Sequence, residues 1–326
     1  MPADPVRRAF ALLAVAALPL FAWPLAAQTT RPLRAVLPVG PGSGVDTIVR
    51  AMSPGITRAL GGQPIVVENL PGAGGITGTH AIVKAPPDGG TIGVVSNNHV
   101  INPSVFKSMP YDALNDITPI SVLGSSPFVL VVNPAKLPVR DLNELVAALK
   151  AKPGDTNYAS SGNGTVLHLA AELFLDGAGV RSRHIPYKGV GPMVTDLLGG
   201  QVDWGVLSVP SVQQHLKSGA LRAIAVPSPK RIDALPDVPT SVEQGLPGFL
   251  IDGWFAVVGP GKMPPAEVKR IHDAFVAAIA MPDVREAMDR QGNVMNPTTP
   301  EAAAAFFKSE QARYAKLVSK AGVKVE

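Results

Sequence analysis

The chain has 326 residues, of which 46% are hydrophobic, so it is long enough for one large domain or for two ordinary domains with cores of their own. It contains no cysteine, which excludes disulfides, thiolate metal sites, a cysteine nucleophile and a lipid anchor attached through cysteine. The formal charge is +4 without any basic run. That charge suits a small anionic ligand and gives little support to nucleic-acid binding.

The N-terminal segment has the pattern of a secretory signal peptide. Arg7 and Arg8 give it a positive start, an apolar stretch follows, and two alanines precede a polar stretch. The predicted signal peptide covers residues 1–27. A membrane anchor is the alternative, but the prolines and the short apolar core argue against a spanning helix. We therefore expect an exported protein without a lipid anchor.

In the remaining chain, strand, polar loop and helix recur about every 30 residues, which is typical of an α/β sheet with parallel strands. The expected strands cover 33–38, 65–68, 91–95, 128–132, 157–159, 184–189 with an exit loop, 202–207, 221–226 and 253–258. Helices are expected between them, and more helices follow residue 264. Pro54 lies inside the first helix and is expected to kink it or split it in two.

Four loops of small or polar residues lie where a strand ends and a helix begins. These loops are 40–44, 71–78, 97–102 and 160–164. Free N–H groups and the positive end of the helix dipole favour an anion at such a point, and glycine lets a ligand approach the backbone closely. The alternative is that the glycines serve ordinary turns, with Thr165 or Asn163 as an N-cap.

No convincing catalytic constellation is present. A G-x-S-x-G motif is absent, and no two histidines have the helical spacing of metal ligands. The loop at 72–78 lacks the third glycine of a dinucleotide motif. We therefore expect no cofactor, no metal and no enzymatic activity, with an exported hydrolase or isomerase as a minor alternative.

The pattern of elements predicts two lobes. The chain would cross between them near 127–134 and near 252–259, and two crossing strands make a hinge that can close on a ligand. The expected first lobe is discontinuous, with residues 28–131 plus 254–326, and the second covers 132–253. Each lobe is expected to contain a mixed, mostly parallel sheet flanked by helices.

Several stretches, in combination and order, resemble the Bug family of receptors, which serve tripartite tricarboxylate transporters. The matching stretches are 69–75, 101–104, 158–174, 184–189, 196–203 and 235–240. The resemblance covers essentially the whole mature chain. It implies a type II-like, two-lobed periplasmic binding protein that closes on a small carboxylate, is a monomer and delivers the ligand to membrane subunits of the transporter. An orphan carboxylate sensor that partners a signalling protein is the alternative.

The family holds its ligand's carboxylate with loops that match 42–47 and 160–165 here. The candidate ligand-binding residues, from these loops and their neighbours, are Val39, Gly42, Ser43, Gly44, Asp46, Thr47, Gly74, Asn98, His99, Asn102, Ser160, Ser161, Gly162, Asn163, Gly164, Thr165, His168, Lys188, Leu207 and Ser208. The family often has Asp-Asn where this chain has Leu207-Ser208. Since that acid could pair with an ammonium group, its absence predicts a carboxylate without an amine, with an apolar body near Leu207.

Overall fold

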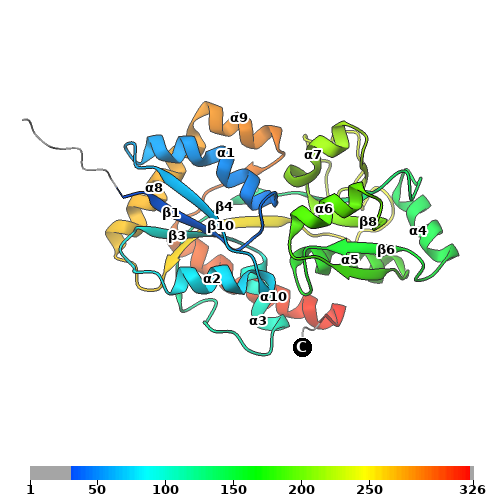
Figure 1. The fold of residues 1–326 in the computed structure, drawn as a ribbon, viewed down its shortest axis with the longest axis horizontal. Helices are drawn as coiled ribbons and strands as arrows, with labels where there is room; N and C mark the ends of the chain where they lie inside the picture. Colours follow the sequence, from blue (N-terminus) through cyan, green and yellow to red (C-terminus); the bar gives the residue numbers. More distant parts are fainter. Residues whose placement is uncertain (1–30, 324–326) are drawn as a thin grey trace, which may run out of the picture. The chain divides into compact units, whose positions relative to one another are not determined.

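Two β-sheets form the framework of the computed structural model, which describes residues 31–323. From Arg31 onward the chain belongs to one compact unit (Figure 1). The predicted signal peptide lies outside the described residues. The six-stranded sheet has the order β11-β4-β10-β3-β1-β2, and the five-stranded sheet has the order β7-β6-β8-β5-β9. The strands of the first sheet are β1 (Leu33–Leu37), β2 (Ile65–Asn69), β3 (Thr91–Ser96), β4 (Ile117–Ser126), β10 (Gly253–Pro260) and β11 (Val294–Met295). Those of the second are β5 (Phe128–Val132), β6 (Asn157–Ser160), β7 (Arg183–Pro186), β8 (Trp204–Ser208) and β9 (Arg222–Ala225).

Both sheets are mixed and most of their strands run in one direction, as expected: β1, β2, β3 and β4 do so in the first sheet, and β6, β7, β8 and β9 in the second. In the first sheet β1 pairs in parallel with β2 and β3, whereas β10 and β4 bring antiparallel pairs. In the second sheet β6 has parallel neighbours, and β5 has antiparallel ones. Strands β5 and β10 run against their neighbours, and each is the strand with which the chain enters one sheet from the other.

The sequence did not indicate strand β4. Its ten residues pair with β10 over Gly253–Pro260, with two register shifts. Pro119 and the small residues near its end interrupt the alternation that marks a strand. A long-range partner, rather than local propensity, therefore makes this segment a strand. It ends at Ser126, and the chain crosses to the second sheet at Pro127.

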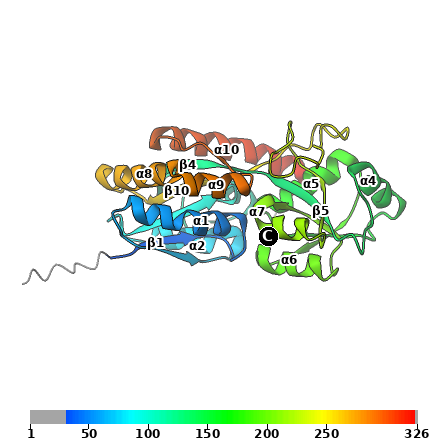
Figure 2. The ribbon, with the colours of Figure 1, turned by 90° about the horizontal axis from the view of Figure 1, so that it is seen from above.

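Helices cover both faces of the six-stranded sheet (Figures 1 and 2). One face packs against α1 (Gly44–Ala59), α8 (Pro265–Ala280) and α9 (Pro282–Arg290), and the other against α2 (Ile76–Val83), α3 (Asn98–Val105) and α10 (Pro300–Ala321). Strand side chains alternate between faces. Accordingly Leu33, Ala35 and Leu37 join the core under α1, while Val36 joins the core on the opposite face.

Helix α1 is continuous through Pro54, so the expected split does not occur. Pro54 is exposed, so water can reach the carbonyl that loses its amide partner there. The Ser53 hydroxyl donates to Val49 O at 2.8 Å within the same turn. The next residue, Gly55, lies against Val284 of α9, where a Cβ would come within 2.5 Å of that side chain.

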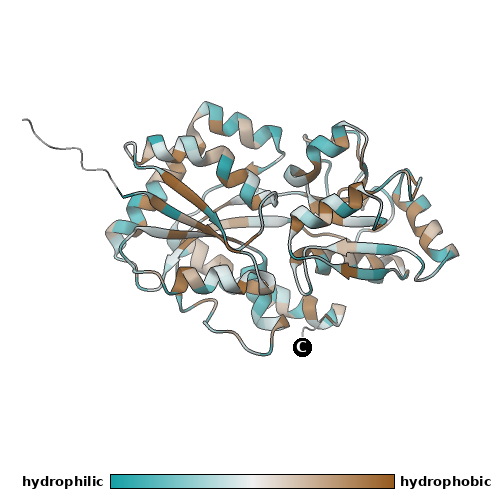
Figure 3. Ribbon diagram, viewed as in Figure 1, coloured by the Kyte–Doolittle hydropathy of each residue, from teal (hydrophilic) through white to brown (hydrophobic). Residues whose placement is uncertain are grey.

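The five-stranded sheet carries α4 (Leu142–Ala151), α5 (Val166–Ala178), α6 (Val190–Leu198) and α7 (Val209–Lys217). Its core is built on Tyr158 and Trp204, whose rings stack at 5.0 Å, with Phe174 against the edge of Trp204. The covering helices show hydrophobic and hydrophilic stripes, as expected for amphipathic helices on a sheet (Figure 3). Among the described helices, none has both the length and the hydrophobicity that crossing a bilayer requires.

A buried asparagine ties the returning strand β10 to the rest of the first sheet. The Asn97 amide accepts from Trp254 N at 3.0 Å and donates to Asp252 O at 3.2 Å and to the Tyr314 hydroxyl at 2.7 Å. Tyr314 belongs to α10. The second point at which the chain passes between the sheets is therefore held by the side chains of Asn97 and Tyr314 and by backbone groups at the start of β10.

Candidate ligand-binding site

A pocket of about 600 Å³ lies between loops that belong to the two sheets, and we call it the main pocket. Its lining consists of residues 38–40, 43, 71–75, 98, 106, 161–163, 165 and 186–190. Its volume is within the range of about 300–1,000 Å³ that is usual for sites of small molecules. A smaller space of about 70 Å³, the inner chamber, adjoins it and shares Val39, Ser43, Asn98, Ser161 and Val190 with its lining.

Helices from both sheets begin at these two spaces. Ser43 is the N-cap of α1, Thr165 is the N-cap of α5, and α6 begins at Val190. Each helix start leaves backbone N–H groups without intrahelical acceptors and presents the positive end of its dipole. Lys188 is the one charged side chain in the main pocket's lining, and neither lining contains an aspartate or a glutamate. The electrostatics therefore favour an anion.

Both N-caps bond the backbone N–H three residues later. Ser43 Oγ accepts from Asp46 N at 3.2 Å, and Thr165 Oγ1 accepts from His168 N at 3.4 Å. Thr165 is thus the N-cap of α5, one of the two alternatives raised by the sequence. Its cap leaves the earlier N–H groups of α5 available to other acceptors.

Asn98 joins the two sheets at the pocket. Its Oδ1 accepts from Val166 N, the first N–H of α5, at 2.8 Å. Asn98 begins α3 on the first sheet, whereas Val166 belongs to the second. This bond therefore holds the halves of the site together and uses one of the amides at the start of α5.

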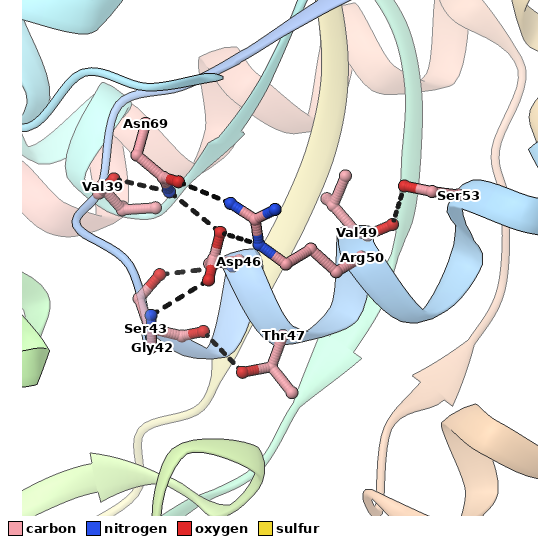
Figure 4. A network of polar contacts seen from close by, with 9 residues as sticks. All are labelled: Val39, Gly42, Ser43, Asp46, Thr47, Val49, Arg50, Ser53 and Asn69. Atoms are coloured by element: carbon pink, nitrogen blue, oxygen red, sulfur yellow. Dashed lines mark hydrogen bonds and ion pairs between the residues drawn. The ribbon is translucent and has the colours of Figure 1, made fainter. Parts of the chain in front are cut away.

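The Asp46 carboxylate stabilises the 40–44 loop through hydrogen bonds but lines neither space (Figure 4). Its carboxylate accepts from Gly42 N at 3.0 Å, from Arg50 Nε at 2.9 Å and from the Asn69 amide at 3.0 Å. Gly42 has a φ of 77°, which favours glycine. The Thr47 hydroxyl donates to a carbonyl of the same loop, that of Ser43, at 3.1 Å.

The structure brings together about half of the candidate residues. Those in the main pocket's lining are Val39, Ser43, Gly74, Asn98, Ser161, Gly162, Asn163, Thr165 and Lys188. Gly44 and Ser208 line the inner chamber. Those that line neither space are Gly42, Asp46, Thr47, His99, Asn102, Ser160, Gly164, His168 and Leu207.

Two of the candidates outside the linings are core residues of their sheets. Leu207 is fully buried in β8, and since strand side chains alternate, its neighbour Ser208 faces the inner chamber instead. An apolar contact at Leu207 itself is therefore not open to a ligand. His99 is buried, its Nε2 lies 2.6 Å from Ala113 O, and its ring stacks on Tyr111. Burial lowers the pKa of His99 to about 4.

Behind the 160–164 loop, His168 and His184 stack with their ring centroids 3.9 Å apart. His168 Nδ1 accepts from Gly164 N at 3.1 Å, and Ser160 Oγ lies 2.6 Å from His184 Nε2. The Tyr158 hydroxyl donates a hydrogen bond to the Glu172 carboxylate, and the Tyr158 ring stacks on His184. These side chains stabilise the 160–164 loop through contacts outside the lining of either space. The sequence did not single out His184 as a partner of His168.

Sequence reasoning also missed Phe106, Pro71 and Tyr187, which line the main pocket. Tyr187 directly precedes Lys188 in a stretch that resembles the family, so proximity could have indicated it. Phe106 follows the last residue of α3, and nothing in the local sequence distinguishes it from a core residue. Among the described residues, no group of three or more His, Asp or Glu side chains is placed to hold a metal ion.

The lowered pKa values of His99, His168 and His184 predict a pH-dependent stability. Desolvation lowers the pKa of His168 to about 3 and that of His99 and His184 to about 4, from 6.5. Between these values the unfolded chain binds protons that the folded chain does not. The free energy of unfolding should therefore fall as the pH decreases from about 6.5 towards 4, by up to about 1.4 kcal/mol per pH unit for each histidine.

Urea unfolding between pH 4.5 and pH 7.5 measures this slope. The His168→Asn variant should show a shallower slope than the wild type, while His215→Asn, whose side chain lies outside this cluster, should keep the wild-type slope. An unchanged slope in His168→Asn would contradict the assignment of a neutral, buried His168.

Comparison with solved structures identifies the class of protein. The two mixed sheets with a pocket between their loops match the solved structure of the periplasmic binding protein BugD with a TM-score of 0.87 and 32% identity, over 91% of this chain and 99% of that one. The expected periplasmic binding protein fold is thus confirmed.

The family follows from the sequence comparisons. A model described as the tripartite tricarboxylate transporter family receptor matches residues 48–323, and Protein BugT of Bordetella pertussis strain Tohama I is 38% identical over 93% of this chain and 94% of its own. The chain therefore belongs to the receptors of the tripartite tricarboxylate transporter family, as the resemblance indicated. It is a solute-binding receptor and not an enzyme.

Two related structures contain carboxylates. MatC from Rhodopseudomonas palustris, solved with bound malate, matches with a TM-score of 0.83 and 28% identity, over 91% of this chain and 100% of that chain. A second R. palustris protein, solved with adipate, matches with a TM-score of 0.86 and 28% identity, over 90% and 98%.

Proposed function

We propose that this receptor captures a small carboxylate without an amine in the main pocket and inner chamber. The observation that carries the proposal is the convergence of helix starts from both sheets on spaces that no carboxylate side chain lines. An anion there gains from the helix dipoles and from Lys188. A ligand ammonium would find no acidic partner in either lining.

Capture involves closure of two lobes, 28–131 plus 254–326 and 132–253, about the crossing strands. Close contacts between the sheets support this step. A Cβ on Gly44 would lie 2.5 Å from Ser208 Oγ, and one on Gly164 would lie 2.3 Å from a methyl group of Val105. Halves that approach this closely cover a ligand between them, so release requires them to separate.

The protein acts in the periplasm, to which the segment 1–27 directs it as a signal peptide, and it delivers its ligand to the membrane subunits of a tripartite tricarboxylate transporter. Its family membership supports this partnership. The malate and adipate in related structures support the ligand class.

A thermal-shift screen tests the ligand class. Malate, adipate and benzoate are compared with aspartate and glutamate at equal concentrations. We expect at least one amine-free acid to raise the melting temperature, because a ligand that binds only the folded state stabilises it, and to raise it more than either amino acid does. Stronger stabilisation by aspartate or glutamate than by every amine-free acid would contradict the proposal.

A further inference from the structure

The inner chamber contains a buried hydroxyl group that the fold itself does not use. Ser126 is the last residue of β4, is only 5% exposed and lines the chamber. Its Oγ makes no hydrogen bond to any described residue. A buried polar group without a partner costs free energy, so a hydroxyl held in this state at a cavity wall points to a partner that enters the cavity.

The hydroxyls of Ser43, Ser208 and Ser161, which also line the chamber, have partners within the chain. Ser43 Oγ accepts from Asp46 N, and Ser208 shares a short hydrogen bond with Ser211. Ser161 donates to the Thr165 hydroxyl at 3.1 Å. Ser126 therefore differs from them because its buried hydroxyl makes no hydrogen bond to any described residue.

The chamber has the size and the electrostatic character of a carboxylate subsite. Its volume of about 70 Å³ compares with roughly 150 Å³ for a cavity that holds benzene, so it accommodates a group of a few non-hydrogen atoms. Gly44 and Val45 at the start of α1 line it, as do Val166 and Leu167 at the start of α5. Two helix dipoles from different sheets thus point their positive ends at the same small space.

We propose that Ser126 is a ligand-binding residue, whose hydroxyl donates a hydrogen bond to the carboxylate group held in the inner chamber between the starts of α1 and α5. The rest of the ligand extends through the shared residues Ser43, Asn98 and Ser161 into the main pocket. This inference rests on the proposed function and specifies which end of the ligand lies in the inner chamber. Ser126 binds the carboxylate group that every ligand of the receptor shares, whereas the main pocket discriminates between the remaining parts of different ligands.

The crossing of the chain between the sheets explains why this residue has that role. Ser126 pairs with Gly253 at the end of the six-stranded sheet, and Pro127 then leads into β5 of the other sheet. The hydroxyl therefore lies next to the point about which the proposed lobes move. A carboxylate bound there contacts the hinge region as well as both helix starts.

The test is calorimetric titration of the wild type and of Ser126→Ala with malate, adipate and benzoate in turn. We expect the affinity of Ser126→Ala to fall about tenfold or more, since the hydrogen bond is to a charged group. The loss should be the same factor for every acid that binds, because the hydroxyl contacts the shared carboxylate. Ser125→Ala is the matched control, since its side chain points to the opposite face of β4 and lines neither space, so its affinities should equal those of the wild type.

Stability provides a second measurement that does not depend on ligand. The melting temperature of unliganded Ser126→Ala should equal or exceed that of the wild type, because no hydrogen bond within the chain is lost. If an acid binds and Ser126→Ala binds it as tightly as the wild type, the inference fails and the proposed function stands. A loss confined to malate would assign Ser126 to the ligand's hydroxyl and overturn the inference. If none of the acids binds the wild type, both the proposed function and the role of Ser126 are contradicted.

Discussion

Replacing Ser161 with tryptophan is expected to weaken carboxylate binding by at least about 100-fold without unfolding the protein. Ser161 lies in the loop between β6 and α5 and lines both the main pocket and the inner chamber. An indole ring at this junction would occupy the space through which a bound ligand extends from the inner chamber into the main pocket. The side chain is partly exposed, so the larger ring can be accommodated by the pocket instead of by the core.

Two controls separate occlusion from other effects. Ser161→Ala loses only the hydroxyl that donates to Thr165, so it should bind within a few-fold of the wild type. Ser218→Trp places the same ring on an exposed residue after α7 and should leave affinity unchanged. Titration calorimetry with the acid that gives the largest thermal shift measures all three. Wild-type affinity in Ser161→Trp would mean that the ligand binds elsewhere.

The second large effect is expected from Gly44→Ala, which should lower affinity about tenfold through closure. A Cβ at Gly44 would lie 2.5 Å from Ser208 Oγ and 3.0 Å from Ser208 Cβ, on the opposite sheet. Rotation of the Ser208 hydroxyl relieves only the shorter contact; the contact with Ser208 Cβ persists in every rotamer, so the halves move apart slightly to admit the methyl group. The unliganded protein should be at least as stable, because alanine favours the first turn of α1 more than glycine does.

A compensating substitution tests the cause. Ser208→Gly removes both clashing atoms, so the double variant Gly44→Ala/Ser208→Gly should recover most of the lost affinity compared with Gly44→Ala. Ser208 makes no side-chain capping bond to α7, so its removal costs the hydrogen bond that its hydroxyl shares with Ser211. Gly248→Ala, where a Cβ meets nothing within 4 Å, is the control for replacing a glycine. A Gly44→Ala variant that binds as tightly as the wild type would show that this contact is absent from the liganded state.

The sequence alone determined the class of fold, the family and the loops that surround the main pocket, because each depends on neighbouring residues. Apolar spacing after residue 165 predicts α5, Thr165 is a typical N-cap, and glycine-rich loops between strand and helix mark where ligands bind. Asp46, His168 and Leu207 show the limit of this reasoning. Asp46 and His168 lie beside those loops and Leu207 lies near the end of β8, yet their side chains face a hydrogen-bond network, a histidine stack and a sheet core.

Only the tertiary structure decided which side chains of those loops line the pocket, since that depends on partners far away in the sequence. The pairing of β4 with β10, more than 120 residues later, makes a strand of a segment with weak strand propensity and carries Ser126 to the wall of the inner chamber. Alternation in β8 turns Ser208 towards the ligand space and Leu207 away from it. Local patterns fix which elements form, whereas long-range packing fixes which way their residues face.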